Sequence, residues 1–264
     1  MESAYFRISY LRIGLPLGRF IFRSIRQRTQ SPASINKAKR VHDFVMEGTC
    51  VEIRRALIII DVQNEFLSAN GNFPISDSCK PDLVANLTTL IPRFRNSGGH
   101  IIWVKALYEN RTEEPSVMKE YPRGDGIVGS NEWLTSATHV HPTPCCEAGS
   151  PGAEIYPDFL NLATPEDKLI TKGWYSAFNG SSELLQTLRE KKVTNVYFCG
   201  VASGTCVLAS VMDAVKLGEW DVHVLQDCMG WRRYNTHEEA IRRYKELKVD
   251  VVNCDQVKVT PSPP

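Results

Sequence analysis

Long apolar stretches are missing from this chain of 264 residues, because no run approaches the ~18 apolar residues that a membrane-spanning helix needs. No internal repeat is visible either. Beyond residue 46, the chain also lacks a basic face interleaved with aromatic side chains. We therefore expect no membrane and no nucleic acid as a partner, and a small molecule as the substrate.

Acidic residues are scarce in residues 1–46, where Glu2 and Asp43 are the only acids beside nine Lys and Arg. This segment carries +7 of a total of +1, so the rest of the chain carries −6. Its composition is typical of a mitochondrial transit peptide, although Gly14 and Pro16 would interrupt an amphipathic helix. A disordered extension or an overlong start of translation is the equal alternative. We expect a cytoplasmic protein, or a mitochondrial one if this segment is a targeting signal.

A dense cysteine framework is absent as well, since eight cysteines are scattered along a chain that is 42% hydrophobic. A chain of this size buries a large core without disulfides, so we expect free thiols in a reducing compartment. The prediction is one domain over residues 47–256, after the basic extension at 1–46 and before a disordered tail at 257–264.

Strand and helix patterns alternate along the domain. Apolar, β-branched runs predict six strands, at 56–60, 100–105, 168–172, 193–199, 222–225 and 249–252. Helical spacing predicts the connections, and Thr236 with Glu239 has the spacing of a capping box for the last helix. We therefore predict an α/β fold, a three-layer α-β-α arrangement on a doubly wound, mostly parallel six-stranded sheet.

Cys206 lies where the strand over 193–199 turns into a helix, with Gly200 and Gly204 allowing a tight turn. The positive end of a helix dipole at this point favours a thiolate, which makes Cys206 a candidate nucleophile. The alternative is an ordinary core cysteine, because cysteine is among the most buried residue types.

Asp61 and Lys172 also come directly after predicted strands. The carboxyl ends of parallel strands meet at one edge of a sheet, where ligands bind in such folds, so both residues are expected beside Cys206. The carboxylate can take the thiol proton, and the ammonium stabilises the anions. Taken singly, Asp61 is equally a loop residue and Lys172 equally a solvated one.

Three motifs in this order resemble the isochorismatase-like cysteine hydrolases over residues 54–253. They are Ile-Ile-Asp61-Val-Gln63-Asn-Glu-Phe66, Thr-Lys172-Gly-Trp-Tyr-Ser176-Ala-Phe178 and Gly200-Val201-Ala202-Ser-Gly-Thr-Cys206-Val, followed by Asp227 and His237. The resemblance implies Asp61 as general base, Lys172 as its cationic partner and Cys206 as nucleophile. It also implies a cis peptide between Val201 and Ala202, with the N–H groups of Ala202 and Cys206 forming an oxyanion hole.

Nicotinamidases of this family carry an Asp-x-His metal site with a further His, and residues 100–116 hold no second His after the strand. We therefore predict no metal and no cofactor. A separate group, His139, His141, Cys145 and Cys146, is read as a polar loop rather than a zinc site, since adjacent cysteines lack the usual spacing of zinc ligands.

Aromatic residues near the three motifs are candidates for an apolar substrate pocket, and each is equally an ordinary core residue. The predicted substrate-binding set is Gln63, Phe66, Trp103, Trp174, Tyr175 and Phe178. Arg232 and Arg233 either bind a substrate carboxylate or are solvated.

The main hypothesis is a metal-independent cysteine hydrolase that cleaves a C–N bond of a small amide, ureide or carbamoyl compound through a thioester. One alternative is hydrolysis of the isochorismate vinyl ether, and another is an inactive binding protein on the same fold. Residues 106–167 lack any clear period, so we expect them to form a lid or the contact of a homo-oligomer.

Overall fold

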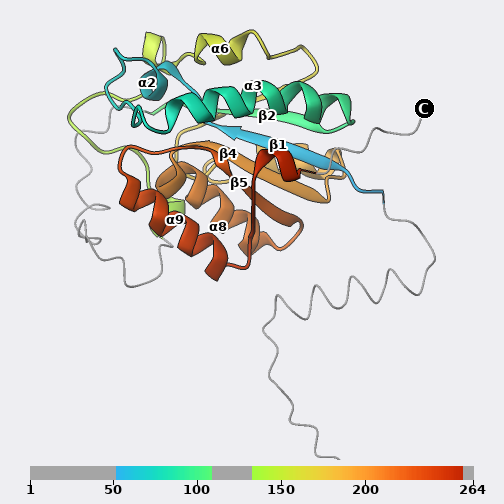
Figure 1. Ribbon diagram of the computed structural model, residues 1–264. Coiled ribbons are helices and arrows are strands. Elements are labelled where there is room, and N and C mark those ends of the chain that lie inside the picture. Colours follow the sequence, from blue (N-terminus) through green and yellow to red (C-terminus); the bar gives the residue numbers. More distant parts are fainter. Residues whose placement is uncertain (1–51, 109–132, 258–264) are drawn as a thin grey trace, which may run out of the picture. The chain divides into compact units, whose positions relative to one another are not determined.

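The computed structural model describes residues 52–108 and 133–257 (Figure 1). The predicted extension at 1–46 and the tail after Val257 lie outside these ranges, as do residues 109–132 within the expected lid or contact region. No helix in the described ranges combines the length and the apolar character that crossing a bilayer requires.

Six strands form one sheet in which every neighbouring pair is parallel, as predicted. The strands are β1 (Arg55–Ile60), β2 (His100–Ala106), β3 (Lys168–Lys172), β4 (Asn195–Val201), β5 (Asp221–Gly230) and β6 (Asp250–Val252). Their order across the sheet is β3-β2-β1-β4-β5-β6. The chain thus winds outward from β1 in one direction and from β4 in the other, which makes the sheet doubly wound.

Helices cover both faces of this sheet, as Figure 1 shows. One face packs against α3 (Lys80–Asn96) and α6 (Pro157–Leu160). The other packs against α7 (Glu183–Glu190), α8 (Leu208–Leu217) and α9 (Tyr234–Glu246). Alternate residues of β1 point to opposite faces, so that Ile58 and Ile60 reach the α8 face while Leu57 and Ile59 reach the α3 face. Three layers and two apolar cores result.

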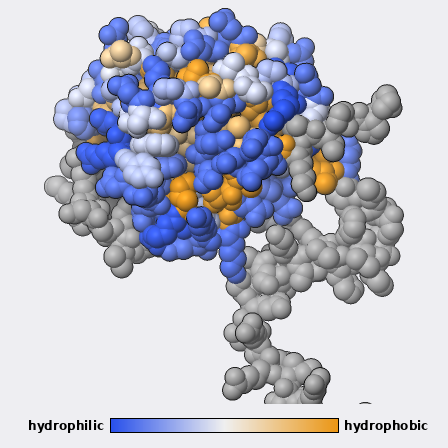
Figure 2. All heavy atoms as spheres, in the orientation of Figure 1, coloured by the Kyte–Doolittle hydropathy of each residue, from blue (hydrophilic) through white to orange (hydrophobic). Residues whose placement is uncertain are grey.

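The surface drawn in Figure 2 is mainly hydrophilic, and its apolar residues form small groups between polar ones. Shorter elements complete the described chain: α2 (Asn64–Leu67), α5 (Trp133–Ser136), and single turns at η1 (Pro151–Ala153), η2 (Ser203–Val207) and η3 (Cys254–Gln256). The predicted polar loop after Asp61 therefore contains a helical turn.

The crevice for a ligand in such a sheet lies where the winding direction changes, at the carboxyl ends of β1 and β4. Asp61 follows β1 directly, with a positive φ of 52° that turns its side chain out of the strand's alternation. Ala202 follows β4 directly, and the peptide bond between Val201 and Ala202 is cis, as the resemblance implied.

Two local predictions are wrong. The helical segment does not start at Cys206 but at Ser203: Ser203–Val207 forms a π-helical turn in which the Val207 N–H donates to the Ala202 carbonyl (3.3 Å), and α8 follows directly from Leu208. Thr236 is not an N-cap, since α9 starts at Tyr234 and the Thr236 hydroxyl donates to the Arg233 carbonyl (2.7 Å).

Gly200 packs directly against β1, and alanine is expected to fit poorly there. Its φ is +107°, and an added Cβ would lie 2.1 Å from the Ile60 carbonyl oxygen. We expect Gly200→Ala to lower the free energy of unfolding by about 2–5 kcal/mol through strain and overpacking. Gly218→Ala is the matched control, because its φ of +68° is also left-handed but its Cβ would meet only a carbonyl oxygen at 4.0 Å. Urea unfolding should show a loss of only about 1 kcal/mol for the control, and equal losses would contradict the packing argument.

Candidate active site

Asp61 and Lys172 form a buried ion pair at the carboxyl edge of the sheet. Asp61 follows β1 and Lys172 ends β3, and β2 lies between these two strands. The Lys172 Nζ lies 2.8 Å from the Asp61 Oδ2, and the two side chains are 1% and 0% exposed. Burial of this kind makes the pair interact strongly, because little water screens the two charges.

Tyr108 connects the ion pair to Cys206. The Lys172 Nζ donates to the Tyr108 hydroxyl (3.2 Å) and to the Trp174 carbonyl (3.1 Å). The Tyr108 hydroxyl lies 3.5 Å from the Cys206 Sγ. The structure thus brings the three predicted side chains together and adds a fourth, whose hydroxyl can donate to the sulfur.

Burial raises the pKa of the Cys206 thiol to about 12, and the charge of Asp61 acts in the same direction. The Lys172 ammonium and the hydrogen bond from Tyr108 lower it, but they do not outweigh burial. Burial therefore opposes the thiolate that the sequence predicts at Cys206. A base beside the sulfur would favour its ionisation.

Asp61 is suited to be that base. Burial raises the pKa of its carboxyl group above the ordinary value, although the Lys172 ammonium opposes the shift. Burial alone would lower the pKa of Lys172, but the charges of Asp61 and Cys206 and the hydrogen bonds to them raise it. The lysine therefore keeps its proton while the carboxylate, more basic than in water, is available for the thiol proton.

The turn that carries Cys206 is held from beneath by α9. The Ser203 hydroxyl, fully buried, lies 3.1 Å from the His237 Nδ1, and the Tyr244 hydroxyl donates to the Ser203 carbonyl (2.6 Å). The His237 ring stacks on Trp231 with centroids 4.1 Å apart. These contacts position the backbone from Ala202 to Cys206, whose role as an oxyanion hole stays a prediction.

Two of the predicted substrate-binding residues lie elsewhere. The Trp103 side chain belongs to the core beneath α3, and its indole N–H donates to the Asp167 Oδ2 (2.9 Å). Phe178 stacks on Trp220, with ring centroids 5.7 Å apart. Trp220 directly precedes β5 and therefore lies at the amino edge of the sheet, away from Cys206. Trp103 points to the α3 face of the sheet, whereas Cys206 lies on the α8 face. Both Trp103 and Phe178 are therefore corrected to packing positions.

Gln63 is also corrected, to a structural position. Its amide nitrogen donates to the carbonyls of Ala106 and Ala153 (both 2.9 Å), and its amide oxygen accepts from the Ala106 N–H (2.8 Å). Both its amide nitrogen and its amide oxygen are thus engaged by backbone groups, and Gln63 ties the end of β2 to the η1 turn. The requirement to satisfy buried backbone groups explains a glutamine here.

The other three predicted substrate-binding residues are half-buried near the site. The Tyr175 ring meets the Tyr108 ring edge-on (centroids 6.1 Å apart), and Phe66 packs against the small cluster that contains Tyr108. The Trp174 carbonyl accepts from Lys172. These three remain candidates for contact with a substrate.

Tyr108 and Glu65 are the residues that the sequence reasoning missed. Tyr108 follows β2 by two positions, so the strand-end argument that selected Asp61 and Lys172 would have selected it as well. Glu65 lies inside the first motif and is 3% exposed. Its Oε1 accepts from the Asn72 N–H (2.5 Å) and its Oε2 from the Cys146 N–H (3.2 Å), which fixes the turn beside Tyr108.

The histidine and cysteine stretch at 139–146 contacts the site through one ring. His139 stacks on Tyr108 (centroids 5.7 Å apart), and its Nε2 lies 3.0 Å from the Thr143 carbonyl oxygen. Within the described ranges, the four His and Cys side chains of this stretch do not converge as a set of metal ligands. The loop therefore supports the tyrosine ring.

Residues 55–256 match the isochorismatase domain. The chain belongs to the isochorismatase family. The match spans all six strands of this isochorismatase-family protein, together with Asp61, Tyr108, Lys172 and Cys206.

Curated relatives of this isochorismatase-family protein carry the names of amide hydrolases. A nicotinamidase/pyrazinamidase of Mycobacterium tuberculosis is 28% identical over 204 residues, 75% of this chain and 98% of the relative. A ureidoacrylate amidohydrolase of Stutzerimonas stutzeri is 27% identical over 180 residues, covering 65% and 68%. A protein of Arabidopsis thaliana, 25% identical and covering 74% and 89%, is named a probable inactive nicotinamidase.

Solved structures show the same fold. A pyrazinamidase of Pyrococcus horikoshii in complex with zinc aligns with a TM-score of 0.59 at 24% identity, over 76% of this chain and 99% of that one. A nicotinamidase of Bacillus subtilis aligns with a TM-score of 0.60 at 21% identity, over 76% and 100%. At these identities the likeness concerns the fold alone.

The raised pKa of Cys206 predicts how its alkylation depends on pH. Below a pKa of about 12, the ionised fraction of the Cys206 thiol rises about tenfold for each unit by which the pH increases. We expect the rate of Cys206 carboxamidomethylation by iodoacetamide, followed by peptide mass spectrometry, to rise from pH 7 to pH 10 without a plateau. A plateau near neutral pH would show a preformed thiolate and contradict this assignment.

Removing the Tyr108 hydroxyl should make Cys206 less reactive. A hydrogen bond to a charged group contributes about 1.5–3 kcal/mol, so Tyr108→Phe should lower the alkylation rate of Cys206 at pH 9 about tenfold or more. Tyr156→Phe is the matched control, because Tyr156 packs on the α3 face and loses only a hydroxyl. An equal rate in both variants would mean that Tyr108 does not stabilise the thiolate.

Proposed function

We propose that this isochorismatase-family protein is a cysteine hydrolase that cleaves the C–N bond of a small amide, ureide or carbamoyl compound. One observation carries the proposal: a nucleophile, a base and a cation from three different strand ends meet in a buried site, with the Lys172 Nζ 2.8 Å from Asp61. The substrate is expected to be small, because Cys206 is only 4% exposed and a large molecule could not reach its sulfur.

In the first half of the reaction, Asp61 removes the thiol proton and the sulfur attacks the carbonyl carbon. Lys172 and the Tyr108 hydroxyl stabilise the negative charge while it is on sulfur. The charge then passes to the carbonyl oxygen, which the N–H groups of Ala202 and Cys206 receive. The intermediate collapses when the protonated Asp61 gives its proton to the leaving nitrogen, so ammonia or an amine departs and a thioester remains.

In the second half, water enters the position of the departed amine. Asp61, again ionised, takes a proton from this water as it attacks the thioester carbonyl, and the C–S bond then breaks. The carboxylic acid leaves, and the sulfur recovers its proton from Asp61. Lys172 holds its proton throughout, in keeping with the direction in which its pKa is shifted.

Two alternatives remain to be distinguished by experiment. The first is an inactive protein, which the name of the Arabidopsis relative favours. The presence of Asp61, Lys172 and Cys206 together argues against it. Isochorismate hydrolysis breaks a vinyl ether and needs no thioester, so it would persist when the thiol is removed.

Ammonia release from a panel of small carboxamides, ureides and N-carbamoyl amino acids should identify the activity. We expect release by the wild type and a fall in kcat of about 10³-fold or more for Cys206→Ala, because the nucleophile is lost. Cys79→Ser replaces another buried thiol, directly before α3, by a hydroxyl that can keep its hydrogen bonds, and should stay active.

Equal turnover by the wild type and Cys206→Ala, with isochorismate as substrate, would establish the vinyl-ether reaction instead. No turnover of any compound, together with a Cys206 that alkylates no faster than the other thiols, would overturn the proposal in favour of a binding protein.

A further inference from the structure

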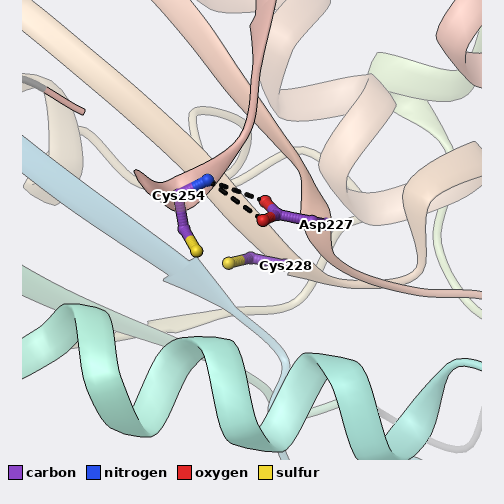
Figure 3. Close-up of side chains that lie close together, drawn as sticks. All are labelled: Asp227, Cys228 and Cys254. Atoms are coloured by element: carbon purple, nitrogen blue, oxygen red, sulfur yellow. Dashed lines mark hydrogen bonds between the residues drawn. The ribbon is translucent and has the colours of Figure 1, made fainter. Parts of the chain in front are cut away.

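A second group of reactive side chains lies on the opposite face of the sheet from Cys206. Asp227 and Cys228 belong to the last part of β5, and Cys254 begins the η3 turn after β6. Figure 3 shows the two sulfur atoms pointing toward each other beside the Asp227 carboxylate. One ligand atom from each residue lies within 4.8 Å of the other two.

The backbone holds this arrangement in place. Both Asp227 oxygens accept from the Cys254 N–H, at 2.9 and 3.1 Å, and the Asn86 side chain donates to the Asp227 carbonyl (2.7 Å). The η3 turn is closed by a capping box between Asn253 and Gln256. These contacts keep the three side chains close together, although 25 or more residues separate Cys254 from the other two in sequence.

The donor set suits a cation of intermediate softness. Two sulfurs and one carboxylate oxygen are common ligands of Zn²⁺, which binds them at about 2.0–2.3 Å. Tetrahedral bonds of this length place the ligand atoms about 3.5–3.8 Å apart, so a contraction of about 1 Å from the present spacing is enough. Cys254 lies in a three-residue turn and is half-buried, so it can make this adjustment.

Charge also favours a divalent ion here. Two thiolates and a carboxylate would bring three negative charges, and Arg93 contributes one positive charge, since its Nη2 donates to the Cys254 carbonyl. The Arg93 Nε is buried and has no acceptor among the described residues. A doubly charged cation would leave the group neutral, because metal ligands of these kinds bind in their deprotonated forms.

We propose that Asp227, Cys228 and Cys254 form a binding site for Zn²⁺ or a cation of similar softness, which fastens the η3 turn to β5. The site is separate from the proposed catalytic machinery and does not depend on the proposed function. It uses residues other than the His and Cys of the 139–146 stretch.

Titration of the full-length, reduced, metal-free protein with Cd²⁺ tests the proposal through the ultraviolet absorption of cadmium–thiolate bonds. We expect one equivalent to bind with this signal in the wild type, in Cys206→Ala and in Cys79→Ser. Cys254→Ser, a change in a half-buried turn that should fold, is expected to lose the signal, and Asp227→Asn to weaken binding at least tenfold. Zn²⁺ should raise the Tm of the wild type by about 5 °C or more and leave that of Cys254→Ser unchanged.

Undiminished binding by Cys254→Ser would assign the ion to other thiols and overturn the proposal. The absence of a cadmium–thiolate signal in the reduced protein would also overturn the proposal. This holds even if mass spectrometry finds a Cys228–Cys254 disulfide in protein prepared without reductant.

Discussion

The ion pair between Asp61 and Lys172 is the interaction on which the site depends. Taking two charges out of water is costly, and it is repaid only when the partners are close and well bonded. Here the charged atoms are 2.8 Å apart, with the Tyr108 hydroxyl and the Trp174 carbonyl accepting the remaining ammonium protons. Loss of either partner would leave a buried, unpaired charge, which typically costs about 3–5 kcal/mol.

The pair also decides what the thiol can do. A cysteine beside a cation is usually an acidic one, but Cys206 is enclosed so completely that its pKa rises to about 12. The same burial raises the pKa of the Asp61 carboxyl group, which makes its carboxylate a stronger base than in water. The proposed transfer of a proton from Cys206 to Asp61 is in keeping with these two shifts.

Much of this arrangement could be predicted from the sequence, for a clear reason. Apolar runs and the residues that end them follow from local pattern, so the six strands, their mostly parallel direction and the residues at their carboxyl ends could be predicted. What a side chain contacts across the sheet was not. Trp103 and Phe178 are apolar in pattern, and only the packing shows that they serve the core. Gln63 is bonded to two backbone segments 43 and 90 residues away, which no local pattern reveals.

Lys172 ends β3, and within the part of the chain that the structure describes β3 is an outer strand, paired with β2. Outer strands detach in local fluctuations that leave the rest of a fold intact. Such an excursion would withdraw the ammonium and uncover Asp61 while the central strands stayed assembled. The ion pair and the global fold therefore need not be lost together: on warming, the contact between Asp61 and Lys172 would break at a lower temperature than the one at which the core unfolds.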